Sequence, residues 1–369
     1  MKRIFYFVLV SAMVLSFSSV ASATVMGVGA RSSAMGGVGI ATANDITAAY
    51  YNPACLSNAG AFDLKLSGGY AMNDLEVLLS ALNAAGDPIT FVENFYDKKI
   101  DAHGALSGIA GLQVGKTIGV SAIPSAIVRA NKEADTVNST FIAKGGYTGI
   151  VTFAQEIDIP GLPFSSISIG GNIKAVNDAN GYANIPSSSP PSPVTTESTF
   201  NVGTGMGFDL GATGKVDIPG LSTLTVGVVL RDVLETIGYK DKTATYQVST
   251  TPPNEGEATL LSESETDRSY IAPMTIGMGA GLTLPGIGTL LAADMNMVGG
   301  DDGDATMRFG FEQPVIGIFA VRGGWSTGAS SSISYGAGIR AGATFDFAYV
   351  VDSKDSRANA LVFELGAQI

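Results

Sequence analysis

The sequence predicts an all-β protein, a transmembrane antiparallel β-barrel of about fourteen strands. The chain is apolar overall, with 46% hydrophobic residues and a mean hydropathy of +0.28. After residue 23, however, it has no apolar run of about 18 residues that could form a membrane helix. Instead, segments of roughly ten residues alternate apolar with polar or small residues, which is the period of a β-strand. Short and long connections take turns between these segments, as in outer-membrane barrels.

The first 23 residues have the features of a secretory signal peptide. Lys2 and Arg3 precede an apolar stretch at residues 4–20, and the small residues 21–23 form a cleavage site ending at Ala23. A retained membrane anchor is the alternative, and the short run that ends in small residues disfavours it. Cleavage lowers the basic residues from 21 to 19 against 33 acidic ones, so the net charge becomes −14. That charge argues against a nucleic-acid partner.

The single cysteine and single histidine exclude several kinds of site. Cys55 has no second cysteine with which to form an internal disulfide. It also lies too far from the cleavage site to carry a lipid anchor, so a small buried side chain is expected. His103 is the only histidine, which excludes metal sites built on histidine or cysteine.

Strand alternation is clearest towards the C-terminal end. Met307, Phe309 and Phe311 fall on one face of a predicted strand, and Arg308 and Glu312 fall on the other. A period of two places these two groups on opposite sides of a sheet. The same pattern is found at residues 167–174, 345–350 and 361–369.

The connections predict the number of strands. Three short turns carry Pro-Gly, the signature of a type II turn, and three others are compact. Seven long polar connections separate them, which gives fourteen strands with both chain ends on the short-turn, periplasmic side. The short turns are expected at 115–117, 159–161, 218–220, 284–286, 312–315 and 340–343, and the long connections at 72–101, 130–140, 176–198, 240–268, 299–305, 326–332 and 352–359.

Charged residues opposite the apolar rows favour a membrane barrel over the alternative, a secreted soluble β-protein. In lipid every backbone amide must be paired within the protein, so strands can span only as a closed barrel. Its inward face is then polar or small, and the 47 glycines suit a crowded interior. A lumenal charged network is therefore expected, made of Arg308, Glu312, Arg322, Arg340, Asp346 and Glu364.

Three motifs with possible chemistry have simpler explanations. Residues 110–117, "AGLQVGKT", match a loosened phosphate-binding loop, but a β-branched, proline-broken segment follows where a helix is needed. His103 has no nucleophile elbow near it. Asp301, Asp302 and Asp304 lack the spacing of a full calcium loop, so a solvated acidic loop is expected. The sequence therefore predicts no enzyme activity, no cofactor and no metal site.

Residues 24–58, the hatch segment, precede the barrel at 59–369. They contain "AMGGVGIATANDITAAYYNPACLS" (34–57), which is too apolar for a solvated linker and has no sustained helical or strand period. Its glycine-rich start with Gly36 and Gly37, the acidic Asp45 and an Asn-Pro-Ala at 52–54 resemble the FadL-like outer-membrane barrels, the fatty-acid-transporter-like family. Residues 307–325 also resemble this family, particularly its TraF-like branch and its type IX secretion shuttle-like branch.

The resemblance implies where the hatch segment lies and what the barrel does. In this family the segment folds into the lumen around the Asn-Pro-Ala turn. Passage of fatty-acid-like or hydrocarbon small molecules across the outer membrane of a Gram-negative-type bacterium is then expected. The apolar residues 75–85 would form the capture surface, with outer-membrane lipid around the barrel. The implied hatch or gate residues are Asn52, Pro53, Ala54, Asp45, Gly36 and Gly37.

The secretion and conjugation branches imply a different function. In this alternative the protein is a non-transporting scaffold or shuttle barrel, and its partners are secretion or conjugation proteins. The acidic residues 240–268 would be the partner surface.

Overall fold

The computed structural model describes most of the barrel and most of the hatch segment. The signal peptide, the capture surface at 75–85 and the acidic residues 301–304 lie outside the described residues. The structure describes residues 27–73, 100–132, 139–159, 164–185, 193–220, 222–249, 253–254, 256–299, 305–328 and 331–369.

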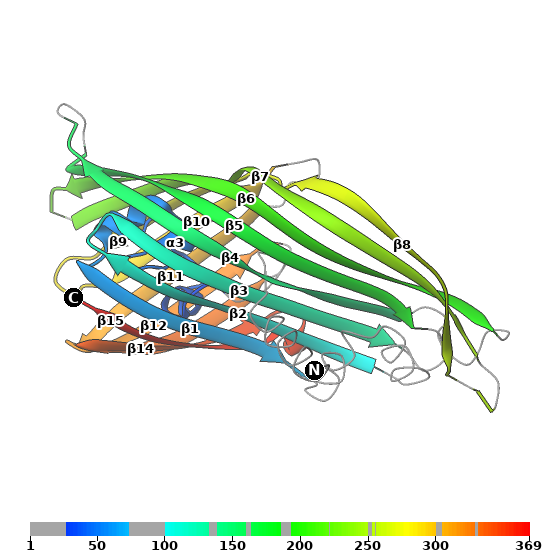
Figure 1. Ribbon diagram of the computed structural model, residues 1–369. Helices are drawn as coiled ribbons and strands as arrows, with labels where there is room; N and C mark the ends of the chain where they lie inside the picture. The colour runs from blue at the N-terminus through cyan, green and yellow to red at the C-terminus, as the bar shows by residue number, and fades with distance from the viewer. Residues whose placement is uncertain are drawn as a thin grey trace.

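The strands form one closed antiparallel sheet (Figure 1). Strands pair with their neighbours in sequence order, except that β7 pairs with both β8 and β9; β1 pairs with β15, and β6 pairs with β7 to complete the ring. The strands are β1 (Phe62–Met72), β2 (Ile100–Val114), β3 (Ile118–Lys132), β4 (Ser139–Ile157), β5 (Ser166–Ile185), β6 (Val194–Ile218), β7 (Ser222–Val248), β8 (Ala258–Ile271), β9 (Thr275–Thr283), β10 (Leu290–Val298), β11 (Ala305–Ile316), β12 (Phe319–Thr327), β13 (Ser332–Ala341), β14 (Ala343–Asp352) and β15 (Ala360–Gln368).

The barrel wall has fourteen strand positions, here called staves, as the sequence predicts. One end of the long strand β7 pairs with β9, and the other end pairs with β8. Strands β8 and β9 follow one another in the chain and pair with the two ends of the same strand, β7. They are therefore two pieces of a single stave. The fifteen described strands thus make a fourteen-stave barrel.

The predicted alternation is confirmed in the wall. Phe309 stacks on Trp325 with ring centroids 5.6 Å apart, and both rings face outward. Phe347 and Phe363 also lie side by side on the outer face, whereas the neighbouring Glu364 is buried inside. An apolar outer face and a polar inner face are those of a membrane barrel.

The tight turns contain one correction. Gly286 and Gly342 have φ of +81°, the left-handed region that these turns require. The turn expected at 312–315 is instead part of β11, which continues to Ile316 and turns at Gly317. Pro314 had indicated a turn, but it lies at a register irregularity within the strand, where a missing N–H is tolerated.

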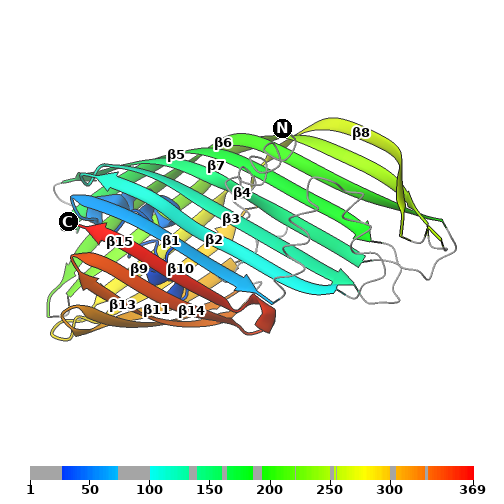
Figure 2. The same ribbon diagram turned by 60° about the horizontal axis from the view of Figure 1, so that its bottom comes forward.

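Two connections predicted as long loops are largely strand. Most of the described residues in 176–198 and 240–268 continue the ladders of β5–β8, so these strands extend beyond the rest of the barrel (Figures 1 and 2). The extension lies at the end away from the C-terminus. Polar composition alone had indicated loops, but polar residues also suit strands that leave the lipid and enter water.

The hatch segment lies inside the barrel (Figure 1). Its elements are α2 (Ala30–Ala34), α3 (Ala48–Tyr51) and the 3-10 helix η1 (Pro53–Asn58); a second 3-10 helix, η2 (Ser356–Ala358), follows β14. Helix α2 packs against β13 and β14, and η1 packs against β4, β5 and β6. These strands are on nearly opposite sides of the ring, so the segment spans the lumen. Within the described ranges, no helix is long and apolar enough to cross a membrane.

We predict that an arginine is tolerated on the extension but not on the barrel wall. Leu66 on β1 is 62% exposed and Leu261 on β8 is 53% exposed, although only the first faces lipid. Leu66→Arg should lower the free energy of unfolding by about 2–4 kcal/mol, and Leu261→Arg should change it little. Urea unfolding in liposomes measures both variants. Equal losses would contradict the membrane position assigned to β1 and β8.

Candidate functional site

Asn52 joins the hatch segment to two strands of the wall. Its side-chain Nδ2 donates towards the carbonyl oxygens of Ile40, at 2.9 Å, Ala212, at 3.2 Å, and Val228, at 3.3 Å. Its Oδ1 accepts a hydrogen bond from the backbone N–H of Ala54 at 3.1 Å. The amide is fully buried. A single side chain thus connects two parts of the hatch segment with β6 and β7.

Proline after Asn52 explains the local geometry. Asn52 is extended, with φ −163° and ψ 111°, as expected for a residue before proline. Pro53 occupies the first position of η1, where its missing N–H leaves no unpaired donor. The Asn-Pro-Ala sequence therefore ends α3 and starts η1 within the lumen.

Wall glycines make room for this turn. A Cβ added to Gly211 on β6 would lie 2.0 Å from the Asn52 Oδ1, and one on Gly170 of β5 would lie 2.5 Å from the Ala54 nitrogen. Neither distance is possible for a real side chain. Residues 52–54 therefore contact the backbone of the wall directly.

Gly36 makes a second close approach, on β11 and β12. A Cβ on Gly324 would lie 2.1 Å from the Gly36 nitrogen. The Gly36 N–H donates to the Ser334 Oγ at 2.8 Å. Gly36 and Gly37 have φ of +74° and +83°, so the turn that follows α2 requires glycine at both positions. The close contact with the wall and the left-handed backbone thus explain why glycine occupies both positions.

Asp45 lies in a buried ion cluster with two strand residues. The Lys65 Nζ on β1 is 2.5 Å from the Asp45 Oδ2 and 2.7 Å from the Glu364 Oε1 on β15. The other Glu364 oxygen accepts the N–H of Ala30, the first residue of α2, at 2.9 Å. The cluster therefore joins two segments of the hatch to neighbouring staves.

The charge state of Asp45 follows from this cluster. Burial raises the pKa of its carboxyl, but the Lys65 ammonium and hydrogen bonds from Lys65 and Thr47 outweigh that effect and hold the pKa at about 2. Asp45 is thus ionised under all ordinary conditions, and its negative charge balances the buried lysine.

A second cluster contains four of the expected charged residues and one from the hatch. Glu312 accepts hydrogen bonds from the Nε atoms of Arg31, at 2.8 Å, and Arg322, at 2.6 Å. The Arg322 Nη1 reaches the Asp346 Oδ1 at 2.5 Å, and the Arg340 Nη2 lies 3.3 Å from Glu312. The remaining expected residue of these clusters, Glu364, belongs to the first one. Both ion clusters lie where the hatch segment meets the barrel wall.

Arg308 is on the inner face but outside these two clusters. It lies in register with Asp294 on β10 and beside Gly37. Asp294 itself accepts the backbone N–H groups of Gly39 and Ile40, at 2.7 and 2.9 Å. The hatch therefore meets the wall at a third polar contact. Cys55 is buried, as expected, and burial raises the pKa of its thiol.

The ladder between β7 and the eighth stave is interrupted. Arg231 pairs with Thr275 of β9, and the next pair along the ladder is Thr236 with Ile271 of β8. Between them, one backbone hydrogen bond of 3.0 Å crosses from Ala272 to Glu235. Residue 273 is proline, which has no N–H to donate to a ladder.

Strand β7 is distorted at the same level. Two register shifts against β6 place extra residues in β7. Asp232 and Leu234 have φ of +61° and +55°, in the left-handed region that a bulky L-residue rarely adopts. Such strain is typical of functional sites rather than of plain structural strands. We call this interruption, residues 232–235 with 272–274, the wall break.

A charged cluster lies behind the wall break, on the lumenal side. The Lys174 Nζ is 3.0 Å from the Asp209 Oδ1 and 2.7 Å from the Glu235 Oε2, and it also pairs with Asp232. The backbone N–H of Asp232 donates to the Asp209 Oδ1 at 2.9 Å. The lysine, on β5, therefore joins β6 to the distorted part of β7.

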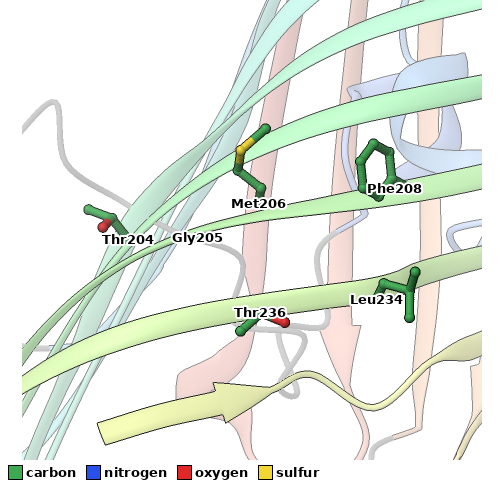
Figure 3. Close-up of a pocket in the computed structure, with 6 residues that line it drawn as sticks. All are labelled: Thr204, Gly205, Met206, Phe208, Leu234 and Thr236. Carbon is green, nitrogen blue, oxygen red and sulfur yellow. The ribbon is translucent and has the colours of Figure 1, made fainter. Parts of the chain in front are cut away.

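On the outer face of β6 and β7, next to the wall break, lies an open depression of about 550 Å³ (Figure 3). Met206 and Phe208 border it on β6, and Leu234 borders it on β7, where it is 79% exposed. The depression is open to the outside rather than enclosed. The remaining lining residues are Thr204, Gly205 and Thr236.

Sequence reasoning missed Arg31, Lys65 and Lys174. Strand alternation would have found two of them, because Lys65 lies between Leu64 and Leu66, which face outward, and Lys174 follows the outward Ile173. Arg31 lies in a segment without strand period, so no such signal marks it. The wall break had no sequence signal beyond Pro273.

We predict that the contact between residues 52–54 and the wall does not tolerate a methyl group. Gly211→Ala should lower the free energy of unfolding by about 1–3 kcal/mol, because the added Cβ overlaps the Asn52 amide. Gly68→Ala is the matched control, since its Cβ would meet nothing within 4 Å. Urea unfolding in liposomes gives both values. An unchanged Gly211→Ala variant would mean that the turn does not rest on the wall.

We predict that the contribution of Asp45 to stability depends on pH. Its pKa of about 2 in the folded protein lies below the ordinary 3.8, so the contribution is present above about pH 4 and is lost as pH falls towards 2. The stability difference between wild type and Asp45→Asn should shrink by about 2 kcal/mol over that range. A pH-independent difference would contradict the ion cluster.

No family model matches the sequence, and no curated protein does. Solved structures with the same architecture are found. The CymD monoaromatic hydrocarbon channel has a TM-score of 0.61 at 13% identity, over 94% of this chain and 99% of the other. The Pseudomonas putida toluene transporter TodX has 0.61 at 12%, over 94% and 99%. A Pseudomonas aeruginosa FadL homologue has 0.53 at 12%, over 95% and 99%. The resemblance predicted from the sequence is thus confirmed at the level of fold: the chain has the fold of the FadL-like barrels.

Proposed function

We propose that the protein passes hydrophobic small molecules, such as hydrocarbons or fatty-acid-like compounds, across the outer membrane. The single observation that carries this proposal is the wall break, with its strained backbone and apolar depression facing lipid. The structural neighbours named as a monoaromatic hydrocarbon channel and a toluene transporter support it.

The filled lumen favours a sideways route over a straight one. On the side of the C-terminus, the hatch segment and two buried ion clusters occupy the barrel interior. Displacement of these ion pairs by an apolar solute would cost free energy, because each charge would be left buried without a partner. At the wall break, by contrast, one backbone hydrogen bond joins β7 to the eighth stave among the described residues, with the Lys174 cluster on its lumenal side. The apolar side chains outside it offer a favourable next contact.

In this proposal the hatch segment closes the lumen below the wall break. Asn52, Pro53 and Ala54 fix its turn to β5 and β6, and Gly36 and Gly37 fix its start to β11 and β12. Helix α3 of the hatch is also tied to the Lys174 cluster, because the Asn172 Nδ2 on β5 donates to both the Ala49 carbonyl oxygen and the Asp209 carboxylate. A shift of the hatch would therefore be transmitted to the Lys174 cluster.

The competing function is a scaffold or shuttle barrel without small-molecule traffic. The extension of β5–β8 beyond the barrel favours it, since exposed strands offer a surface to a partner. The wall break distinguishes the two functions, because a scaffold has no need of a depression that opens to lipid.

We predict that filling the depression blocks passage. Proteoliposomes whose outer leaflet carries lipopolysaccharide should take up a fluorescent naphthalene probe faster with the wild type than without protein. The Met206→Trp/Leu234→Trp variant should reduce the protein-dependent rate about tenfold, an added barrier of about 1.4 kcal/mol. Leu66→Trp, on a lipid-facing site away from the break, is the control and should keep the rate. A wild type without effect would refute transport, and equal rates in all three proteins would refute the route.

A further inference from the structure

Strand β8 is the edge of the sheet beyond the barrel. It stands at one end of the strand order, and among the described strands it pairs only with β7. Figures 1 and 2 show it on the extension, running from the far tip back to the ring of staves. Every side chain from Thr259 to Ile271 is exposed. In an antiparallel strand, alternate residues direct their N–H and C=O groups away from the paired neighbour. Strand β8 therefore presents a row of hydrogen-bonding groups to solvent.

The side chains along this edge follow a pattern. Glu263, Glu265 and Asp267 alternate along the centre of the strand and so share one face. Leu260 and Tyr270, 43% and 41% exposed, lie near its two ends. The strand thus offers an acidic centre between apolar ends.

Neighbouring lysines on β7 offset only part of the acidic charge. Lys242 pairs with Glu263 at 2.8 Å, whereas Lys240 is 3.9 Å from Glu265. All four side chains are about half exposed or more, so these pairs contribute little stability. Three carboxylates therefore remain available to cations on the outer side of β8.

Charge argues against a second copy of this chain as the occupant of the edge. An antiparallel β8–β8 pairing centred on Glu265 places that residue opposite itself and Glu263 opposite Asp267. Like charges in directly opposite positions destabilise a strand pair. The same acidic row that attracts a cationic strand thus prevents self-association.

We propose that the outer edge of β8 is a docking site for an extended, basic segment of another protein, which adds to the sheet as a further strand. Lysine or arginine at every second position would face Glu263, Glu265 and Asp267. Apolar residues at the ends of the segment would cover Leu260 and Tyr270. Main-chain hydrogen bonds supply affinity in this mode of recognition, and alternate side chains supply specificity. The proposal does not depend on transport through the barrel.

The test measures peptide binding to the full-length protein in nanodiscs. The probe is a fluorescent nine-residue peptide with lysine at every second position and leucine near each end. Wild type should bind it, and Glu263→Lys/Glu265→Lys/Asp267→Lys should weaken binding about tenfold or more. Glu156→Lys/Asp158→Lys/Asp217→Lys, exposed residues at the short-turn end, changes the net charge equally and should leave binding unchanged. Both variants alter exposed side chains, and circular dichroism verifies that each is folded.

A second peptide separates strand addition from simple charge attraction. Methyl groups on alternate backbone nitrogens keep every charge but remove the hydrogen bonds of one edge, so this peptide should bind about tenfold more weakly. Equal binding of the two peptides would overturn the proposal, as would no binding by wild type. Cross-linking of two barrels through β8 would also overturn it, in favour of a second copy as the occupant.

Discussion

Closure of the backbone hydrogen-bond ladder is the constraint on which the rest of this structure depends. No water is available in lipid to pair with an open strand edge, so fourteen staves must form a ring. Closure of the ring determines which face of each strand points into the lumen, and that face carries the lysines, arginines and carboxylates. Closure also encloses a lumen, which the hatch segment fills. The wall glycines follow from the hatch, because backbone can approach backbone at Gly211 and Gly324 only without side chains.

The wall break lies where this constraint is locally relaxed. Pro273 cannot continue the ladder, and β7 accommodates the mismatch with two bulges and two left-handed residues. Buried charge offsets the loss of pairing, since Lys174 draws Asp209, Asp232 and Glu235 together across β6 and β7. A ladder is cooperative and hard to open, whereas a few side chains can rearrange. The wall break is therefore the part of the wall that can rearrange most easily, and it lies next to lipid.

Strand architecture was predictable from the sequence because period two is a local signal. Phe309, Phe347 and Phe363 marked the outer face, and the staves could be counted from turns such as Gly342. The extension was not predictable, since residues 240–268 carry the polar composition of a loop and only their pairing partner makes them strands. The site was partly predictable. Residues 52–54 were marked by their resemblance to a family motif, whereas Arg31 and Lys174 acquire their roles only from partners distant in sequence.

The two ends of the barrel differ in how firmly they are fixed. Towards the C-terminus, Lys65 and Arg322 each connect two carboxylates, and the hatch is held on nearly opposite walls. Removing one partner would leave a buried charge unpaired, which typically lowers the free energy of unfolding by about 3–5 kcal/mol. At the other end, the ion pairs of β7 and β8 are exposed and weak. Any movement is therefore expected at the wall break and in the extension of β5–β8, whereas the end that contains the hatch segment stays rigid. This division suits a barrel that admits a solute without opening a continuous water channel.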